Sequence, residues 1–154
     1  MKIQTKTGIY MEALYNEESN KKLEDFCLNL SLNSVEWKND FHTTILFSKQ
    51  PFDGEIDFPM IRDRLVFPKE LKLFSTNNPD MNALVLTLEA PQLVKIHKEY
   101  MKRYNLAYDF DEYQPHVTLA YIPNSYIATK PIDGIDFLEI EKINITNIKE
   151  QWLK

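Results

Sequence analysis

Phe41–Ser48 (FHTTILFS) and His116–Tyr121 (HVTLAY) decide the predicted fold, because each places a His-x-Thr triplet in a stretch typical of a β-strand. Successive side chains of a strand point to opposite faces. His42 therefore shares a face with Thr44, and His116 shares a face with Thr118. The opposite faces are mainly apolar and predict contact with a core. Two such pairs facing one cleft would supply two imidazoles and two hydroxyls, which suits proton transfer at a phosphate.

The surroundings of the triplets repeat along the chain. In the first half, Gly8–Leu14 predicts a strand, and a helix is expected to begin after the N-cap residue Asn16. In the second half, Ala83–Leu88 predicts a strand, and Pro91 suits the first turn of a helix. Helix start and histidine are separated by 25 residues in the first half (Glu17 to His42) and 24 in the second (Gln92 to His116). Apolar side chains follow at helical spacing in both helices: Leu23, Phe26, Cys27 and Leu30, then Leu93, Ile96, Tyr100, Met101 and Tyr104.

A duplicated strand–helix–strand unit predicts a single α+β domain over residues 1–154, with lobes of approximately 1–78 and 79–154. The loop Ser75–Asp80 is the expected boundary between them. The remaining expectations are a turn at Gln50–Gly54, an extended segment Phe58–Phe67 broken by Pro59, a strand Lys69–Ser75, a long loop Ile122–Gly134 and a final strand through Ile143 and Ile145.

Composition narrows the classes of partner. The chain has 154 residues and a net charge of −5, with 18 basic and 23 acidic side chains, so no basic face for a long nucleic acid is expected. The densest basic cluster, Lys95, Lys98, Lys102 and Arg103, belongs to the polar side of the second helix. We expect no signal peptide and no membrane span. Cys27 is the single cysteine, which predicts a buried, inert thiol and a cytoplasmic location.

The two histidines predict general acid–base chemistry. Imidazole titrates near neutrality, so one histidine can accept a proton while the other donates one. The threonine hydroxyls can donate hydrogen bonds to non-bridging phosphate oxygens. No metal is needed if the nucleophile is a neighbouring ribose 2′-hydroxyl, since the substrate itself holds it close. The scissile bond would be a 3′–5′ ribonucleotide linkage and the first product a 2′,3′-cyclic phosphate. The residues leave open which histidine is the base.

The paired His-x-Thr motifs resemble those of the two-histidine (2H) phosphoesterase superfamily. Gly8–Glu12, Phe41–Leu46 and Gln114–Leu119 look closer still to the phage anti-CBASS phosphodiesterases, over nearly the whole chain. The resemblance implies a bilobal fold, with two antiparallel sheets flanking a central cleft and helices outside. It implies His42, Thr44, His116 and Thr118 as a catalytic tetrad without metal or cofactor.

The implied substrates are cyclic di- and trinucleotide immune messengers such as cGAMP, and the implied role is evasion of a bacterial antiphage defence in the host cytoplasm. For holding the bases of such a substrate, we expect Tyr10 and Trp152 to stack, each base being worth about 1–3 kcal/mol. Glu141 or Glu150 could accept from a base amino group, and Tyr113 is a weaker candidate.

Three alternatives remain. The same tetrad would serve an RNA 2′,3′-cyclic phosphodiesterase or RNA-end-processing enzyme. Asp40, His42 and His116 could form a two-histidine, one-carboxylate metal site. A non-catalytic nucleotide-binding module would not require both histidines. The third histidine, His97, lies beside the apolar stripe of the second helix and is expected to be structural.

Overall fold

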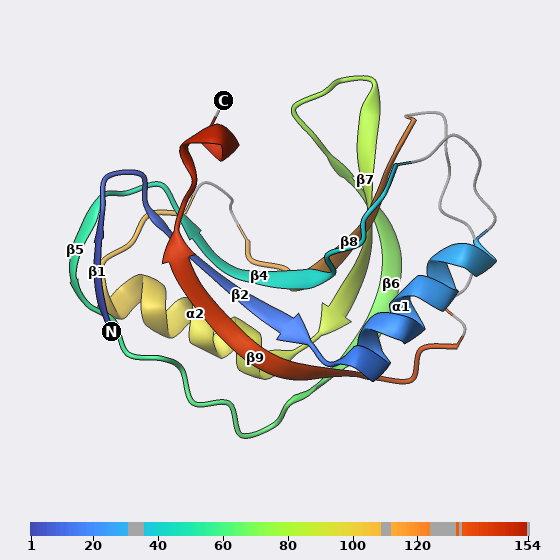
Figure 1. The fold of residues 1–154 in the computed structure, drawn as a ribbon, viewed down its shortest axis with the longest axis horizontal. Helices are drawn as coiled ribbons and strands as arrows, with labels where there is room; N and C mark the ends of the chain where they lie inside the picture. The colour runs from blue at the N-terminus through green and yellow to red at the C-terminus, as the bar shows by residue number, and fades with distance from the viewer. Residues whose placement is uncertain (31–35, 109–111, 124–131, 133, 154) are drawn as a thin grey trace.

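The fold is a mixed α/β arrangement dominated by antiparallel strands (Figure 1). The computed structural model describes residues 1–30, 36–108, 112–123, 132 and 134–153. Within these residues the order is β1 (Lys2–Thr5), β2 (Ile9–Tyr15), α1 (Glu17–Asn29), β3 (Glu36–Trp37), β4 (His42–Ser48), β5 (Phe52–Glu55), β6 (Leu65–Ser75), β7 (Met81–Glu89), α2 (Pro91–Arg103), β8 (His116–Pro123), β9 (Leu138–Asn147) and the 3₁₀ helix η1 (Glu150–Leu153). Most of the expected loop 122–134 lies outside the described residues.

The strands of the described residues form two sheets. The large sheet has the order β3-β8-β7-β6-β9-β2-β4, and β1 pairs with β5 in a small one. In the described part of the large sheet, the strand ladder between the halves β4-β2-β9 and β6-β7-β8-β3 is the pairing of Leu65 and Val66 of β6 with Glu139 and Leu138 of β9. The sheet curves strongly (Figure 1), and β4 approaches β8 to within 8 Å between Cα atoms. The two His-x-Thr strands are thus brought together from opposite halves.

The loop expected as the boundary between lobes lies between two strands that pair with each other. Ser75–Asp80 is the connection of the β6–β7 hairpin, because β6 pairs with β7 from Phe67 to Ser75. Strand β9, near the end of the chain, pairs along the length of β2, near the start of the chain. The division into lobes of residues 1–78 and 79–154 stays a prediction, and neither stretch forms its half of the sheet alone.

Both predicted helices are present. Asn16 caps α1, since its side-chain oxygen accepts a hydrogen bond from the Ser19 backbone N–H at 2.9 Å. Pro91 opens α2, and Lys102 and Arg103 complement the helix dipole in its last turn. Helix α2 packs against β4, which belongs to the other half of the chain. Neither of these 13-residue helices, nor any other in the described part of the chain, is long and apolar enough to span a bilayer.

Two local expectations were wrong. Gln50–Gly54 is not simply a turn, because Phe52–Glu55 is strand β5, paired with the unpredicted β1. Strand β6 begins at Leu65 and runs through Pro68 rather than starting after it. The register with β7 shifts between Pro68 and Glu70. Such a bulge accommodates a proline that has no N–H for the ladder. Pairing with strands distant in sequence determined the conformation of both segments, and local turn residues do not predict such pairing.

Candidate active site

The strands β4 and β8 match residue by residue. From each histidine onward, seven positions show the same order of partly buried and fully buried side chains. Each strand also bulges directly after its triplet: Ile45 has no partner between Met11 and Glu12 of β2, and Leu119 has none between Leu84 and Val85 of β7. A bulge re-aims the neighbouring side chains. The two His/Thr pairs therefore have the same local backbone setting.

Both imidazoles are oriented by the same contact. His42 Nδ1 donates to the Asp40 carbonyl oxygen at 2.8 Å, and His116 Nδ1 donates to the Gln114 carbonyl oxygen at 2.8 Å. A carbonyl oxygen only accepts, so each Nδ1 must carry the hydrogen. The neutral form of each ring then has Nε2 as its free acceptor. Each histidine can accept a proton at Nε2 or, once protonated, donate one from it.

The two histidines lie within electrostatic reach of each other. Burial lowers the pKa of His116, the hydrogen bond with Gln114 opposes this shift, and the charge of His42 lowers the pKa further. A second link joins the strands, because the Tyr113 hydroxyl, just before β8, donates to the Thr44 carbonyl oxygen of β4 at 2.7 Å. His42 and Thr44 thus lie on β4, and His116 and Thr118 lie on β8, two strands that approach each other.

The two histidines line separate cavities that have no lining residue in common, so the single cleft expected between the motifs stays a prediction. His42 lines a cavity of about 390 Å³ together with Glu12, Asp40, Glu141 and Lys142. His116 and Thr118 line a larger one of about 660 Å³, whose walls include Phe74, Ser75, Thr76, Asn77, Ala83, Val85, Tyr108, Glu112, Gln114 and Tyr121. The Phe74 ring meets His116 edge to face, with 4.9 Å between centroids. The His42 side is therefore polar and acidic, and the His116 side is mainly aromatic and apolar.

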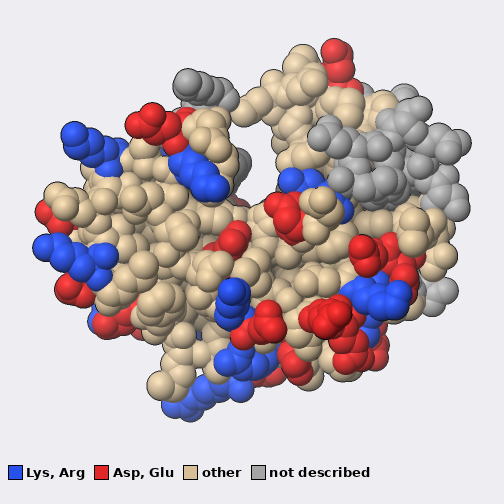
Figure 2. All heavy atoms as spheres, in the orientation of Figure 1, with Lys and Arg blue, Asp and Glu red and all other residues tan. Residues whose placement is uncertain are grey.

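The space-filling view shows a deep notch in the upper edge of the molecule (Figure 2). It opens between the C-terminal 3₁₀ helix η1 and the β6–β7 hairpin, above the place where β4 crosses in Figure 1. On this face, acidic and basic side chains of the described residues alternate, and no continuous basic stripe is seen. This face lacks the continuous basic pattern of a nucleic-acid track.

Of the substrate-binding candidates, Tyr10 contacts the side chains of the first motif. Its hydroxyl is 3.1 Å from Thr44 Oγ1, and its ring lies 6.4 Å from that of His42. Burial raises the pKa of Tyr10, so the phenol is neutral and acts as a hydrogen-bond donor or acceptor. Trp152 is 43% exposed and meets the Tyr10 ring edge at 5.2 Å between centroids. Because Tyr10 is only 8% exposed, Trp152 covers it and presents the more accessible ring of the two.

The two acidic candidates, Glu141 and Glu150, lie in different places relative to the motifs. Glu141 lies in β9 and lines the His42 cavity, and its backbone oxygen accepts from Arg64 at 2.8 Å. Glu150 is exposed in η1 and is not among the residues that line either motif cavity. Tyr113 does not face a ligand space with its hydroxyl, which is used on Thr44, and its ring stacks on His97 at 4.2 Å. The structure gives Tyr113 a role in joining the two motif strands.

The residues predicted to be structural are buried. His97 is 6% exposed and its Nδ1 donates to the Ile45 carbonyl oxygen at 2.7 Å. Burial lowers the pKa of His97. Cys27 is 6% exposed, and burial raises the pKa of its thiol to about 12, so it is a poor nucleophile at neutral pH. Both predictions are confirmed.

In the metal-site alternative the carboxylate ligand is Asp40, and this carboxylate forms an ion pair with a lysine. The Asp40 side chain pairs with Lys38 Nζ at 3.4 Å, while its backbone oxygen holds His42. Across the residues that the structure describes, no group of three His, Cys, Asp or Glu side chains has the arrangement of a metal site.

Sequence reasoning missed one charged residue of the site, Glu12. In β2 it lies directly opposite Thr44, and its Oε2 is 4.0 Å from His42 Nε2. The sequence pattern did contain a signal for Glu12: it is two residues from Tyr10 on a predicted strand, so the two side chains share a face. Phe74 was missed as well. Its proximity to His116 depends on the pairing of the β6–β7 hairpin with β8, which local pattern does not predict.

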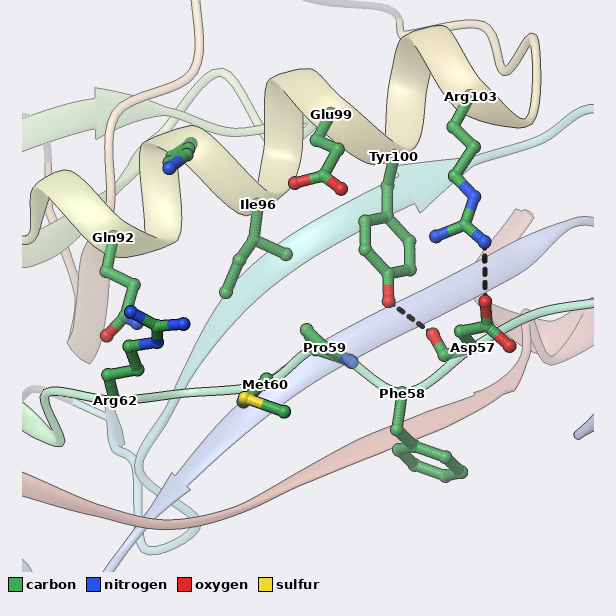
Figure 3. A pocket seen from close by; sticks show the side chains of 11 residues that line it. Asp57, Phe58, Pro59, Met60, Arg62, Gln92, Ile96, Glu99, Tyr100 and Arg103 are labelled. Carbon is green, nitrogen blue, oxygen red and sulfur yellow. Dashed lines mark hydrogen bonds and ion pairs between the residues drawn. The ribbon is translucent and has the colours of Figure 1, made fainter.

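A further cavity, of about 410 Å³, lies between α2 and the segment 57–62 (Figure 3). Tyr100 donates to the Asp57 carbonyl oxygen, and Arg103 pairs with the Asp57 carboxylate at 2.5 Å. The figure shows both side chains reaching from the helix to this segment. None of the motif residues lines this cavity, and its contacts fasten the segment to α2.

The comparisons with known proteins concern nearly the whole chain. The family described as "Anti-CBASS protein Acb1" matches residues 7–153. A relative of that name from Escherichia phage RB16 is 32% identical over 148 residues, covering 94% of this chain and 78% of the relative. Relatives of the same name from Salmonella phage S16 and Enterobacteria phage T4 are 27% and 28% identical, each covering 75% of this chain and 72% of the relative. The chain, with both of its His-x-Thr strands inside the match, belongs to the Acb1 family of anti-CBASS proteins.

Proposed function

We propose that this protein is a metal-independent phosphodiesterase that cleaves 3′–5′ bonds of cyclic di- and trinucleotide immune messengers, such as cGAMP, and so counters the CBASS defence in the host cytoplasm. The observation that carries the proposal is the matched pair of histidines on neighbouring strands, each with Nδ1 hydrogen-bonded to a backbone carbonyl, which leaves Nε2 as the nitrogen that can exchange a proton. The family membership supports the choice of substrate and role.

In the proposed mechanism the substrate supplies its own nucleophile. One histidine removes the proton of a ribose 2′-hydroxyl, the O2′–P bond forms, and the P–O5′ bond breaks. The other histidine protonates the departing O5′. The first product is a linear oligonucleotide that ends in a 2′,3′-cyclic phosphate. Each proton transfer typically contributes about 10²–10⁴ in rate. Thr44 and Thr118 donate to the non-bridging oxygens as charge shifts there.

We also propose that the two halves are the duplicated units of a 2H phosphoesterase fold with one cleft between them. The matching bulges at Ile45 and Leu119 and the matching burial order of β4 and β8 support a duplication. Tyr10 and Trp152 are the proposed stacking surface for a base, and Glu141 the proposed acceptor for a base amino group.

The test is product analysis by chromatography and mass spectrometry. The protein is incubated in EDTA with a panel of cyclic di- and trinucleotides, and with 2′,3′-cyclic mononucleotides as the RNA-processing alternative. We expect cleavage of the cyclic oligonucleotides only at 3′–5′ bonds that carry a free 2′-hydroxyl, with undiminished rate in EDTA. Loss of turnover in EDTA would favour the metal site. Faster turnover of the 2′,3′-cyclic mononucleotides would favour the RNA enzyme.

Variants separate catalysis from binding. His42→Ala and His116→Ala should each abolish turnover while retaining much of the ligand affinity, measured by calorimetry. His97→Gln removes the remaining histidine of the chain, can still donate to the Ile45 carbonyl, and is the control: it should lose far less turnover than either alanine variant. Turnover that persists in both alanine variants would refute catalysis by this pair and leave a nucleotide-binding module.

A further inference from the structure

A groove follows helix α2 on a part of the surface that the proposed active site does not use. Its main part is the cavity of about 410 Å³ between α2 and the segment 57–62 (Figure 3). It continues into a neighbouring cavity of about 330 Å³ at the start of the helix, because Arg62, Gln92 and Lys95 line both. The two cavities together form the α2 groove. None of the motif residues lines either of them.

The segment that forms one side of the α2 groove exposes two large apolar side chains. Phe58 is 54% exposed and Met60 is 78% exposed. The segment is tied to α2 at both ends: the Asp57 carboxylate pairs with Arg103 at 2.5 Å, and the Asp63 backbone N–H donates to a glutamine side chain of α2 at 3.1 Å. The apolar side chains are therefore presented on a fixed frame, and such exposed patches mark contact surfaces.

The rim of the α2 groove is basic. The exposed charged side chains of α2 are four cations and one carboxylate: Lys95, Lys98, Lys102, Arg103 and Glu99. Arg62 adds a cation from the segment. In the part of the chain that the structure describes, neither Arg62 nor Lys95 forms an ion pair. A surface that combines apolar side chains with unpaired cations is complementary to a partner that is acidic and apolar.

Helix α1 of the same chain has the complementary character. Its exposed residues include four acids, one lysine and one leucine: Glu17, Glu18, Glu24, Asp25, Lys21 and Leu28. Leu28 is 76% exposed, and it lies one turn beyond Glu24 and Asp25, so the three side chains share a face. An apolar anchor flanked by charges on one face is the pattern of a helix that binds in a groove.

The two surfaces are placed to join different molecules. Figure 1 shows α1 and α2 towards opposite ends of the long axis, so the α1 face does not reach the α2 groove of its own chain. A contact between two different faces is heterologous, and each added molecule brings one free face of each kind. Association through these surfaces would therefore extend beyond a dimer.

We propose that α1 of one molecule docks in the α2 groove of a second copy of this chain. Leu28 is the apolar anchor and packs on Phe58 and Met60. The carboxylates of α1 face Arg62 and Lys95. A helix face and a groove bury less than the standard interface of about 1,600 Å², so the association is weak and reversible. It leaves both motif cavities free, so the inference is independent of the proposed function.

The experiment is sedimentation equilibrium over a range of protein concentrations. We expect the average mass of the wild type to rise with concentration at about 0.05 M salt and to stay near that of the monomer at about 0.5 M, where the charges are screened. Leu28→Ser should weaken the association about tenfold or more, since it removes the buried side chain. Leu28→Met keeps an apolar anchor of similar volume and should still associate.

Charge reversal tests the partner directly. Glu24→Lys and Lys95→Glu should each weaken self-association, because each places like charges across the contact. Mixing the two variants should restore association, since the reversed helix of one then meets the reversed groove of the other. Asp80→Lys is the matched control: it makes the same charge change as Glu24→Lys on the exposed β6–β7 connection and should associate like the wild type.

Three results would overturn the inference: a wild type that stays monomeric at every concentration, association that Leu28→Ser leaves unchanged, or a mixture of the two charge-reversed variants that stays monomeric. A monomeric wild type that sediments with vesicles of phosphatidylcholine and phosphatidylglycerol would assign the groove to a lipid surface instead. Turnover of a cyclic dinucleotide is measured on the same samples. Association without turnover refutes the proposed function alone, and turnover by a strict monomer refutes this inference alone.

Discussion

At the scale of single residues, Gly8 is the clearest constraint on the entry to β2. Its φ is +119°, and a Cβ at this position would lie 1.9 Å from the Ser48 carbonyl oxygen. The backbone conformation and the contact both exclude a side chain. The close approach matters for the site, because it joins the start of β2, which carries Tyr10 and Glu12, to the end of β4.

Gly8→Ala should therefore destabilise the protein by more than about 3 kcal/mol, since backbone strain and a clash with backbone atoms add. Gly134→Ala is the matched control: φ there is +84°, yet a Cβ would have nothing within 4 Å. It should cost only about 1 kcal/mol, the strain alone. Urea unfolding measures both, and equal losses would contradict the role assigned to the contact with Ser48.

His97 predicts a pH dependence of stability. Its pKa in the folded protein is lowered by burial, so below about pH 6.5 the unfolded chain binds more protons than the folded one. Stability is complete above the unfolded pKa and is lost as pH falls. His97→Gln does not titrate and can still donate to Ile45. The slope of unfolding free energy between pH 6.5 and 5 should become shallower by up to about 1.4 kcal/mol per pH unit. An unchanged slope would show that His97 binds its proton equally well in the folded and the unfolded protein.

At the scale of elements, the site depends on how β4 and β8 are held together. No ladder of backbone hydrogen bonds joins them, since β4 pairs with β2 and β8 pairs with β7 and β3. The Tyr113 hydroxyl makes a direct connection to Thr44, and its ring stacks on His97 of α2, which in turn binds Ile45. One small cluster thus fixes the segment before β8 against β4.

Tyr113→Phe tests this connection. It leaves the stacking surface and removes the donor to the Thr44 carbonyl, so we expect a loss of about 1 kcal/mol in unfolding free energy. Because a small shift between the histidines weakens catalysis, kcat/KM should fall with no change in the shape of the pH profile. Tyr104→Phe, which removes an acceptor from the Asp57 backbone N–H, is the control and should leave kcat/KM unchanged. Equal effects on activity would contradict the proposed link.

At the scale of the whole molecule, the two halves of the large sheet are interlocked. Strand β6 precedes β7 in the chain and pairs with it, whereas β9 returns from the end of the chain to β2. At the junction, Arg64 donates to the carbonyl oxygens of Ile140 and Glu141 at 3.1 and 2.8 Å. Each half of the sheet therefore combines strands from distant parts of the chain: β9 joins β2 and β4, and β3 joins β8.

We therefore expect a single cooperative unfolding transition. Far-ultraviolet circular dichroism and intrinsic fluorescence should give coincident urea curves. Arg64→Ala should lower the midpoint without splitting the transition, because the junction contributes to both halves at once. Two resolved transitions in the wild type would show that the halves are independent units.

The sequence by itself determined the motif strands, both helices and the cap at Asn16, because period-2 and period-3.6 patterns and capping residues are local signals. It also determined which side chains of each triplet share a face, and that Cys27 and His97 are buried. The tertiary structure alone decided that β1 pairs with β5, that β9 returns to β2, and that β4 lies against β8. These depend on contacts between residues far apart in the chain, which no local pattern encodes. For the same reason only the fold could bring Glu12 to His42 and Phe74 to His116, and so make two like triplets chemically different.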